Sequence, residues 1–324
     1  MKRICTTLFA LAIVLTGLAQ KPDKALSKVS YNFIHVQDTN QRDKPYTENM
    51  LLFIGKNASA YTSQDKITQA ALRRKKIEEA VKAQSENSTN TLKLDGTGIK
   101  KTSNIDYFNF ISESKFFTKE KLVNNYLIEE PTPKLNWKIS KDTTSISGIH
   151  CQKATAYFKG RNWIAWFATD LPFQSGPWKL NGLPGLIVEA YDDKKDVQFL
   201  FNGMEKIEEI TEVVKKNEDK ETKIVTSGGN VSVLNIVGLG EAENQNLLNG
   251  NISLPQDGIR TTKKDLDKLK DAAKKDPVGF INAQMAGRAS EIQVTGYGKK
   301  TTTFTTAPKI EINNPIELPE KNEN

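Results

Sequence analysis

The sequence is poor in cysteine and histidine, and this narrows the chemistry that the chain can perform. It has 324 residues, with 2 cysteines and 2 histidines. No GxSxG, HExxH, CxxC, phosphate-loop or calcium-loop motif accompanies His35 and His150. His150 and Cys151 are neighbours, so on a strand they point to opposite faces and do not form a catalytic pair. We therefore expect no metal and no organic cofactor.

Long hydrophobic runs are also missing, apart from one short run near the N-terminus. Lys2 and Arg3 precede the apolar run 8–15, and small residues follow it up to Ala19. This is the pattern of a secretory signal peptide, whereas a membrane span needs about 20 apolar residues. We expect residues 1–19 to be removed and no membrane-spanning segment to remain. The mature protein is then exported, to the periplasm or out of the cell.

Export leaves a single cysteine in the mature chain, because Cys5 belongs to the predicted signal peptide. One thiol cannot form an internal disulfide. The fold must therefore rest on its hydrophobic core, and we expect Cys151 to be buried in that core as a small apolar group.

The net charge of +7 does not produce a basic surface stripe. The lysines alternate with acidic residues in segments such as KKIEEAVK and KKDLDKLKDAAKKD. Such segments form solvated faces, and no aromatic residues interleave with them for stacking on bases. Nucleic acid is therefore not an expected partner.

The dominant hydrophobic period is two, which is typical of β-strands. Alternating or short apolar runs occur at 27–36, 50–54, 107–111, 122–128, 186–191, 197–201, 207–214, 223–226 and 231–237. Residues 149–172 contain two further strands around Lys159-Gly160-Arg161-Asn162, a hairpin signal. Because strands and helices do not alternate regularly, the pattern disfavours a doubly wound parallel sheet. We predict a mainly β fold: a curved antiparallel sheet or partial barrel with a few packed helices.

The domain organisation follows from the same pattern. We expect one domain over residues 20–318, with lysine-rich insertions near 65–104 and 204–223, and a disordered tail at 319–324.

Helices are expected at the periphery of the sheet. Residues 65–84 are rich in helix formers but carry only a thin apolar stripe. Thr262, with Asp265 three residues later, is a capping signal for another helix. Pro277 suits the first position of the helix after that one.

The segment GPWKLNGLPGLIVEAYDD, residues 176–193, is the most strongly specified part of the chain. Its prolines and glycines predict tight turns, in which Gly185 supplies a positive φ. Gly182 is expected to let another backbone or a ligand approach closely. We interpret the segment as a rigid corner that either buries its leucines in the core or lines a pocket or an interface.

This segment carries a resemblance to a known family. Gly182-Leu183-Pro184-Gly185-Leu186-Ile187 is the hexapeptide that names the GLPGLI family of exported proteins. Gly176-Pro177, Gly160-Arg161 and Asn314-Pro315-Ile316-Glu317-Leu318 also resemble that family. The resemblance is strong over 149–193 and loose elsewhere, and the lysine-rich insertions depart from it. The family is functionally uncharacterised, so the resemblance implies an exported protein of the Gram-negative cell envelope and no particular reaction.

The candidate binding residues lie close together in the sequence. They are Arg161, Trp163, Trp166, Phe173 and Trp178. Aromatic side chains on a curved sheet can hold an acyl chain or a hydrophobic peptide, but such clusters are also typical of a core. Arg161 either holds a carboxylate, stacks on Trp163, or is a plain surface residue of the hairpin turn.

Glu189, Asp192 and Asp193 are the remaining candidates for catalysis. Two carboxylates serve as general acid and base in glycosidases. Asp-Asp-Lys-Lys between two strands is also typical of a solvated turn.

Three classes of function stay open. The first is a non-catalytic binding module for a lipid, a hydrophobic peptide or an envelope protein partner. The second is a structural or assembly accessory of an outer-membrane complex, without a pocket of its own. The third is a carboxylate-based hydrolase, which requires Glu189 or Asp192 to face a cleft.

Overall fold

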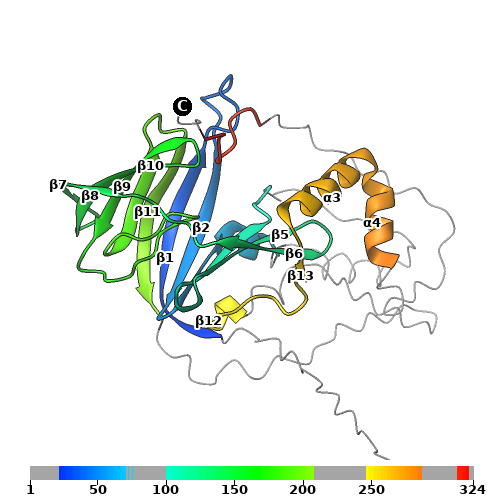
Figure 1. Cartoon of the computed structure of the whole chain (residues 1–324), viewed down its shortest axis with the longest axis horizontal. Helices are drawn as coiled ribbons and strands as arrows, with labels where there is room; N and C mark the ends of the chain where they lie inside the picture. Colours follow the sequence, from blue (N-terminus) through cyan, green and yellow to red (C-terminus); the bar gives the residue numbers. More distant parts are fainter. Residues whose placement is uncertain are drawn as a thin grey trace, which may run out of the picture.

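One large sheet dominates the protein (Figure 1). The computed structural model describes residues 22–70, 72, 75, 100–207, 246–286 and 312–320. Within them, the strand order is β13-β6-β5-β4-β3-β2-β1-β11-β10-β9-β8-β7, with β12 beside β1. The strands are β1 (Asp23–His35), β2 (Tyr46–Gly55), β3 (Ala58–Ser63), β4 (Ile105–Phe110), β5 (Lys115–Lys121), β6 (Asn125–Pro131), β7 (Lys138–Ile146), β8 (Ile149–Phe158), β9 (Arg161–Ala168), β10 (Leu186–Asp192), β11 (Val197–Lys206), β12 (Asn251–Ile252) and β13 (Ile259–Arg260). Besides the helical residues 64–70 and 246–248, the helices are η1 (Ile111–Glu113), α3 (Lys263–Lys275) and α4 (Pro277–Ala286).

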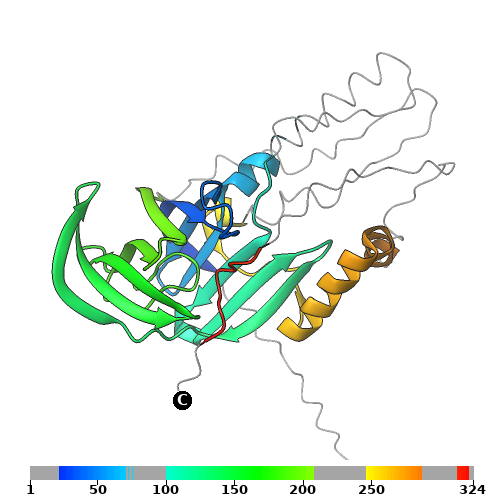
Figure 2. The same cartoon turned by 90° about the horizontal axis from the view of Figure 1, so that it is seen from above.

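The sheet is antiparallel, except that β13 runs parallel to β6. It is open and curved, with β7–β10 at one end and β4–β6 at the other (Figure 2). The predicted mainly β fold with a curved antiparallel sheet is therefore confirmed. In the described part of the chain, no helix is long and apolar enough to cross a membrane.

The alternation in the sequence sets which side chains face the concave side of the sheet. Trp163, Ala165 and Phe167 of β9 are buried in the main core, whereas Trp166 lies on the outer face. Cys151 is buried on that outer face, as predicted. Burial raises the pKa of its thiol to about 11.

The predicted hairpin joins β8 to β9. Its turn residues are Lys159 and Gly160, with φ values of 50° and 72°. Two successive residues with positive φ are typical of the tight turn that matches the twist of a hairpin. The β7–β8 turn repeats this geometry at Ser147 and Gly148, with φ values of 49° and 83°.

The corner segment, residues 169–185, leaves β9 and folds into the concave side of the sheet before β10 begins. Trp178, Leu180 and Leu183 are buried there against the sheet, in the main core cluster. A second apolar cluster includes Leu51 and Phe53 of β2, whose side chains point away from that core. The corner segment therefore supplies side chains that pack on the concave side of the sheet.

The structure reverses the roles predicted for two glycines of this segment. Gly182 has the positive φ, 86°, and open space around it. Gly185 does not have a positive φ, but a Cβ there would overlap the carbonyl oxygen of Ala168. The prediction was wrong because the chain runs directly against the end of β9 at this point, where Leu186 N donates to Leu171 O at 2.9 Å.

The peripheral helices begin where the sequence predicted. Thr262 Oγ1 accepts from Asp265 N at 3.1 Å and caps α3, and α4 begins at Pro277. Residues 64–70 are helical, which agrees with the start of the helix predicted at 65–84. The described residues do not include the predicted signal peptide, the strands predicted at 223–226 and 231–237, or residues 321–324. Of the strand predicted at 207–214, only residue 207 is described.

Candidate functional site

A cavity of about 360 Å³ lies on the concave side of the sheet. Six of the residues that line it are aromatic: Phe33, Tyr46, Tyr61, Tyr107, Trp178 and Phe199. Ile312, Pro315 and Ile316 of the C-terminal segment, residues 312–320, form part of its wall. Ligand sites of small molecules are concave, mostly apolar and upward of roughly 300 Å³. This cavity has the size and the lining of such a site.

Neighbouring strands bring the lining together through cross-strand pairs. Phe33 of β1 lies opposite Glu48 of β2, and His35 lies opposite Tyr46. Tyr61 of β3 lies opposite Tyr107 of β4. Because residues two apart on a strand share a face, the period-two pattern of the sequence concentrates these rings on the concave side.

Trp178 enters the cavity wall from the corner segment with an unusual backbone. Its φ is 56°, in the left-handed region that bulky residues rarely adopt. The ring packs against Trp163 with 5.5 Å between the ring centroids, and Trp163 in turn stacks on Phe199 at 6.0 Å. Strained backbone of this kind persists only where the surroundings fix it, and it concentrates at functional positions.

Within the described part of the chain, two side chains of the cavity wall carry buried polar groups without a hydrogen-bond partner. They are the hydroxyl of Tyr61 and Nε1 of Trp178, whose residues are 3% and 4% exposed. Trp178 Nε1 lies near the hydroxyl of Tyr107. Burial raises the pKa of Tyr107 and this contact lowers it, but the contact does not have the geometry of an ordinary hydrogen bond. Burial raises the pKa of Tyr61 well above its usual value, so its hydroxyl stays a neutral donor. A buried unpaired donor costs about 1–3 kcal/mol, which a ligand acceptor or a water would recover.

Two other polar side chains of the wall, His35 and Glu48, have hydrogen-bond partners. His35 Nε2 donates to the carbonyl oxygen of Asn314 at 2.7 Å, and burial lowers the pKa of His35. Glu48 accepts from Tyr46 Oη at 2.8 Å, from Ser103 N at 2.8 Å, and from the hydroxyl of Ser63. Among the buried polar groups of the wall that the structure describes, the unpaired ones are therefore those of Tyr61 and Trp178.

The structure places the predicted binding residues in three different surroundings. Trp178 lines the cavity, Trp163 lies directly behind it, and Phe173 packs half-buried against the same core. Trp166 lies on the opposite face of the sheet, where its Nε1 donates to Tyr191 Oη at 3.3 Å. Arg161 is buried beneath the C-terminal segment.

Arg161 is 3% exposed, so the interpretation as a surface turn residue is wrong. Its Nη1 lies 2.6 Å from Asp192 Oδ2, and both side chains are buried. The interpretation of Asp192 as part of a solvated turn is therefore also wrong, although Asp193 is exposed. Glu189 lies opposite Trp166, on the outer face of the sheet. Glu189 and Asp192 thus do not face one cleft as an acid and base pair.

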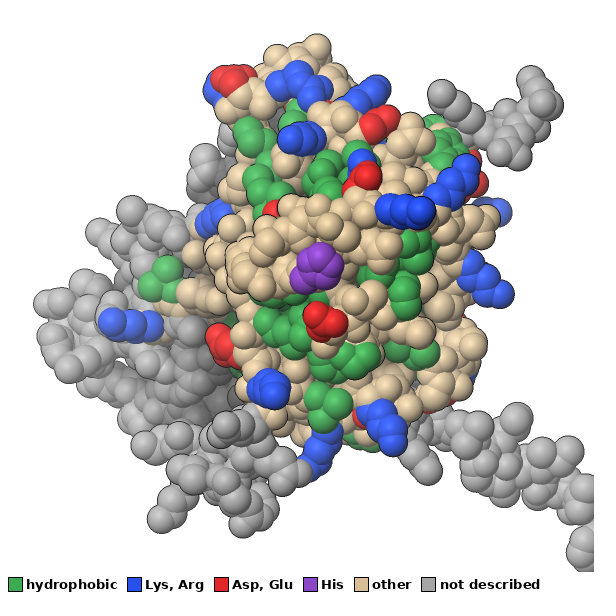
Figure 3. Space-filling model, turned by 90° about the vertical axis from the view of Figure 1, so that its left-hand side faces the viewer, with side chains coloured by type: hydrophobic (Ala, Val, Ile, Leu, Met, Phe, Trp, Pro, Cys, Tyr) green, Lys and Arg blue, Asp and Glu red, His purple; other side chains and the backbone are tan. Residues whose placement is uncertain are grey.

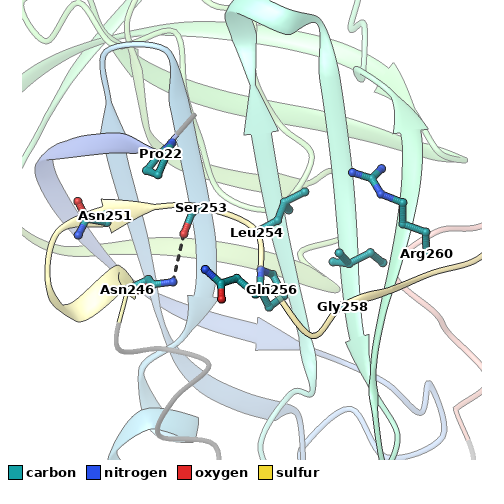
Figure 4. Close-up of a pocket in the computed structure, with 10 residues that line it drawn as sticks. Pro22, Asn246, Asn251, Ser253, Leu254, Gln256, Gly258 and Arg260 are labelled. Carbon is teal, nitrogen blue, oxygen red and sulfur yellow. Dashed lines mark hydrogen bonds between the residues drawn. The ribbon is translucent and has the colours of Figure 1, made fainter. Parts of the chain in front are cut away.

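A larger cavity, of about 540 Å³, lies beside β12 and β13 (Figure 4). None of the ten residues that line it is aromatic, and Arg260 is the charged one among them. Asn246 Nδ2 donates to Ser253 Oγ at 3.2 Å across part of its wall, and Arg260 is engaged by Glu129 at 3.0 Å. Its lining of mostly small and polar residues offers less apolar surface to a ligand than the aromatic cavity does.

Sequence reasoning missed Tyr61 and Glu48 as wall residues, and Asn314 as the partner of the wall residue His35, because segments far apart in the chain bring them together. The available signal was the alternation in β1, which places Phe33 and His35 on one face, together with the Asn-Pro pair near the C-terminus. Neither signal says which other strands lie opposite.

Residues 157–189 match a family described as "Protein of unknown function (Porph_ging)". No curated protein matches the chain. Two solved structures of a protein called PNGF-II resemble it, with 11% identity and a TM-score of 0.39 over 58% of this chain, and 10% identity and a TM-score of 0.43 over 75% of it. The chain spans about a third of their length, 29% and 32%. Similarity at this level carries no argument about function.

Proposed function

We propose that the protein is a non-catalytic binding module that holds a hydrophobic ligand in the aromatic cavity. The observation that carries this proposal is the pair of buried, unpaired donors, Tyr61 Oη and Trp178 Nε1, in the wall of a cavity with six aromatic residues. Aromatic walls with a few placed polar groups are typical of sites for small apolar molecules.

The wall also indicates the class of ligand. Apolar surface favours an acyl chain or a hydrophobic peptide side chain. The unpaired donors favour a ligand with one acceptor, such as an ester, amide or carboxyl oxygen. The cavity, at about 360 Å³, suits a small hydrophobic molecule or one end of a longer chain.

The proposal includes export to the Gram-negative cell envelope. It is supported by the basic start, the short apolar run and the small residues before Ala19 in the sequence.

The experiment is native mass spectrometry of the protein purified from an envelope extract, followed by titration with N-phenyl-1-naphthylamine, whose fluorescence rises in apolar surroundings. We expect a defined extra mass and one probe site per chain. Trp178→Phe should weaken probe binding, because it removes the indole from the cavity wall. Trp166→Phe is the matched control on the outer face. Equal effects of the two substitutions, or no saturable binding, would contradict a ligand site in the cavity.

A second candidate function, a structural accessory of an envelope complex, is favoured by the outer face of the sheet. Tyr157 is 46% exposed there, and Ile164 and Trp166 are half-buried beside it on the same face. Hydrophobic side chains lie among scattered charges on that side of the molecule (Figure 3). Photo-crosslinking from position 157 in envelope extracts tests this candidate, which requires a specific protein adduct.

A further inference from the structure

The C-terminal segment, residues 312–320, is bound to the sheet like a peptide ligand. It runs in an extended path between the strands β8–β9 and β5–β6 (Figure 2). It is not a strand of the sheet, and 25 residues separate Ile312 from Ala286, the end of α4. Its position therefore depends on the contacts that its own residues make.

Asn314 is the anchor of the segment, and every polar group that it offers is used. Its Oδ1 accepts from Arg161 Nη2 at 2.7 Å, and its Nδ2 donates to Val36 O at 2.7 Å. Its backbone oxygen accepts from His35 Nε2 at 2.7 Å, and its N donates to Gln37 O at 3.0 Å. An amide side chain, with a donor and an acceptor, fits this position, and the isosteric carboxylate does not.

The residues after Asn314 are recognised through their backbone and one charge. Arg161 donates to Pro315 O at 2.7 Å and to Ile316 O at 2.8 Å. Glu317 lies 2.9 Å from Lys179 Nζ. Leu318 N donates to Lys159 O at 3.0 Å. The site thus binds an Asn side chain, two consecutive backbone carbonyls and a Glu side chain. These contacts are typical of the recognition of an extended peptide with a defined sequence.

We propose that this face is a peptide-binding site for the segment Asn-Pro-Ile-Glu-Leu, and that it accepts the segment from a second copy of the chain as well as its own. The contacts of the segment do not depend on which chain supplies it. A second copy of the chain carries the same segment, so it can make the contacts that the structure shows. The 25-residue connection reaches roughly 80–90 Å at full extension, and exchange of an identical element is a low-cost route to a dimer. The proposal does not depend on a ligand in the aromatic cavity.

Gly160 offers a way to block the site without disturbing the hairpin. A Cβ at Gly160 would lie 2.6 Å from Leu318 Cβ and 2.8 Å from Pro319 O. Asn tolerates the positive φ of this turn position, so Gly160→Asn should keep the turn and expel the segment. Gly148→Asn is the matched control, because Gly148 holds the same turn position with nothing within 4 Å of such a Cβ.

The experiment mixes two full-length variants. Gly160→Asn has a blocked site and a free segment, whereas Asn314→Ala has an open site and a defective segment. We expect each variant to be monomeric alone and the equimolar mixture to form a heterodimer with one copy of each in native mass spectrometry. Gly148→Asn in place of Gly160→Asn should give no heterodimer, because its own segment fills its own site.

A second measurement keeps the proposal testable if Gly160→Asn does not fold. A fluorescent synthetic peptide of residues 311–320 is titrated into full-length Asn314→Ala. We expect saturable binding. The affinity should fall about tenfold or more when the peptide carries Ala in place of Asn314. Absence of peptide binding would overturn the peptide site. Where both variants fold, peptide binding by Asn314→Ala without a heterodimer in the mixture would overturn the second copy as the occupant of the site.

Discussion

The guanidinium of Arg161 donates to the backbone carbonyl of Ile316 at 2.8 Å, which joins the β8–β9 turn to a residue 155 positions later. The same guanidinium is paired with Asp192, which also accepts from Val197 N at 2.9 Å. One side chain therefore links the hairpin, the end of β10 and the C-terminal segment that walls the cavity. Arg161, the first residue of β9, therefore contributes to the shape of the candidate site although it is not among the residues that line the cavity.

Arg161 and Asp192 should behave as a strongly coupled pair. Removing one partner leaves the other charge buried and unpaired, which costs about 3–5 kcal/mol. We expect Arg161→Met and Asp192→Leu each to lower the free energy of unfolding by that amount, and the double variant to lose much less than the sum. Urea denaturation of the three variants measures this cycle. Additive losses would show that the pair contributes little through its mutual interaction.

Tyr61 and Tyr31 provide a matched comparison of an unpaired and a paired buried hydroxyl. Tyr31 Oη donates to Ile187 O at 2.7 Å, whereas Tyr61 Oη has no partner. The rings lie 6.4 Å apart in one cluster. Tyr31→Phe should destabilise the protein by about 1 kcal/mol, and Tyr61→Phe should be neutral or stabilising in the ligand-free protein. Thermal unfolding followed by circular dichroism gives both values.

A ligand should reverse the outcome for Tyr61. If its hydroxyl donates to the ligand, Tyr61→Phe lowers the affinity for the ligand that co-purifies while it raises or leaves unchanged the stability of the free protein. Loss of stability in free Tyr61→Phe, of the size seen for Tyr31→Phe, would mean that the hydroxyl has a partner in solution, and it would remove the main support for the ligand site.

Local patterns in the sequence predicted much of the fold. Alternation placed Trp163 and Trp166 on opposite faces of one strand, and the turn at Lys159-Gly160 and the cap at Thr262 depend on neighbouring residues alone. Such features are decided within a few residues, so composition and spacing are enough to predict them.

The site was harder to predict because its contacts are long-range. The Arg161 environment depends on Asp192 and Asn314, which lie 31 and 153 positions away. Nothing near Arg161 in the sequence indicates either partner. The sequence alone therefore does not distinguish a buried, paired arginine from an exposed turn residue. Gly182 and Gly185 show the same limit: both glycines are required, but only the packing of the chain against Ala168 decides which one serves close approach.

The two glycines of the corner should respond differently to a side chain. Gly185→Ala forces a Cβ into the carbonyl of Ala168, a backbone atom that cannot turn aside. We expect a loss of about 1–3 kcal/mol or more, as for other overpacked sites. Gly182→Asn adds a side chain into open space at a φ that Asn tolerates, so its cost should be smaller. Midpoints of urea unfolding rank the two, and the reverse order would contradict the close approach at Gly185.

His35 should make the stability of the protein depend on pH just below neutrality. Burial lowers the pKa of His35, and Arg161 lowers it further, while the hydrogen bond to Asn314 and the charges of Asp192 and Asp196 raise it. Between this lowered pKa and the unfolded value of about 6.5, the unfolded chain binds more protons than the folded chain. The contribution of His35 to the free energy of unfolding should therefore be fully present above about pH 6.5 and should fall as the pH drops below that value.

His35→Gln isolates this contribution, because Gln still offers an N–H to the carbonyl of Asn314 but does not titrate. The two proteins must be compared because other groups also titrate. Burial raises the pKa of Glu189, so Glu189 increases the free energy of unfolding as the pH falls, which opposes the effect of His35. We expect the native protein to lose more stability than His35→Gln between about pH 7.5 and about pH 5.5. Hydrogen exchange at Asn314 N, which donates to Gln37 O, should accelerate over the same interval in the native protein alone. Parallel pH profiles of the two proteins would show that His35 takes up its proton as readily in the folded state as in the unfolded chain.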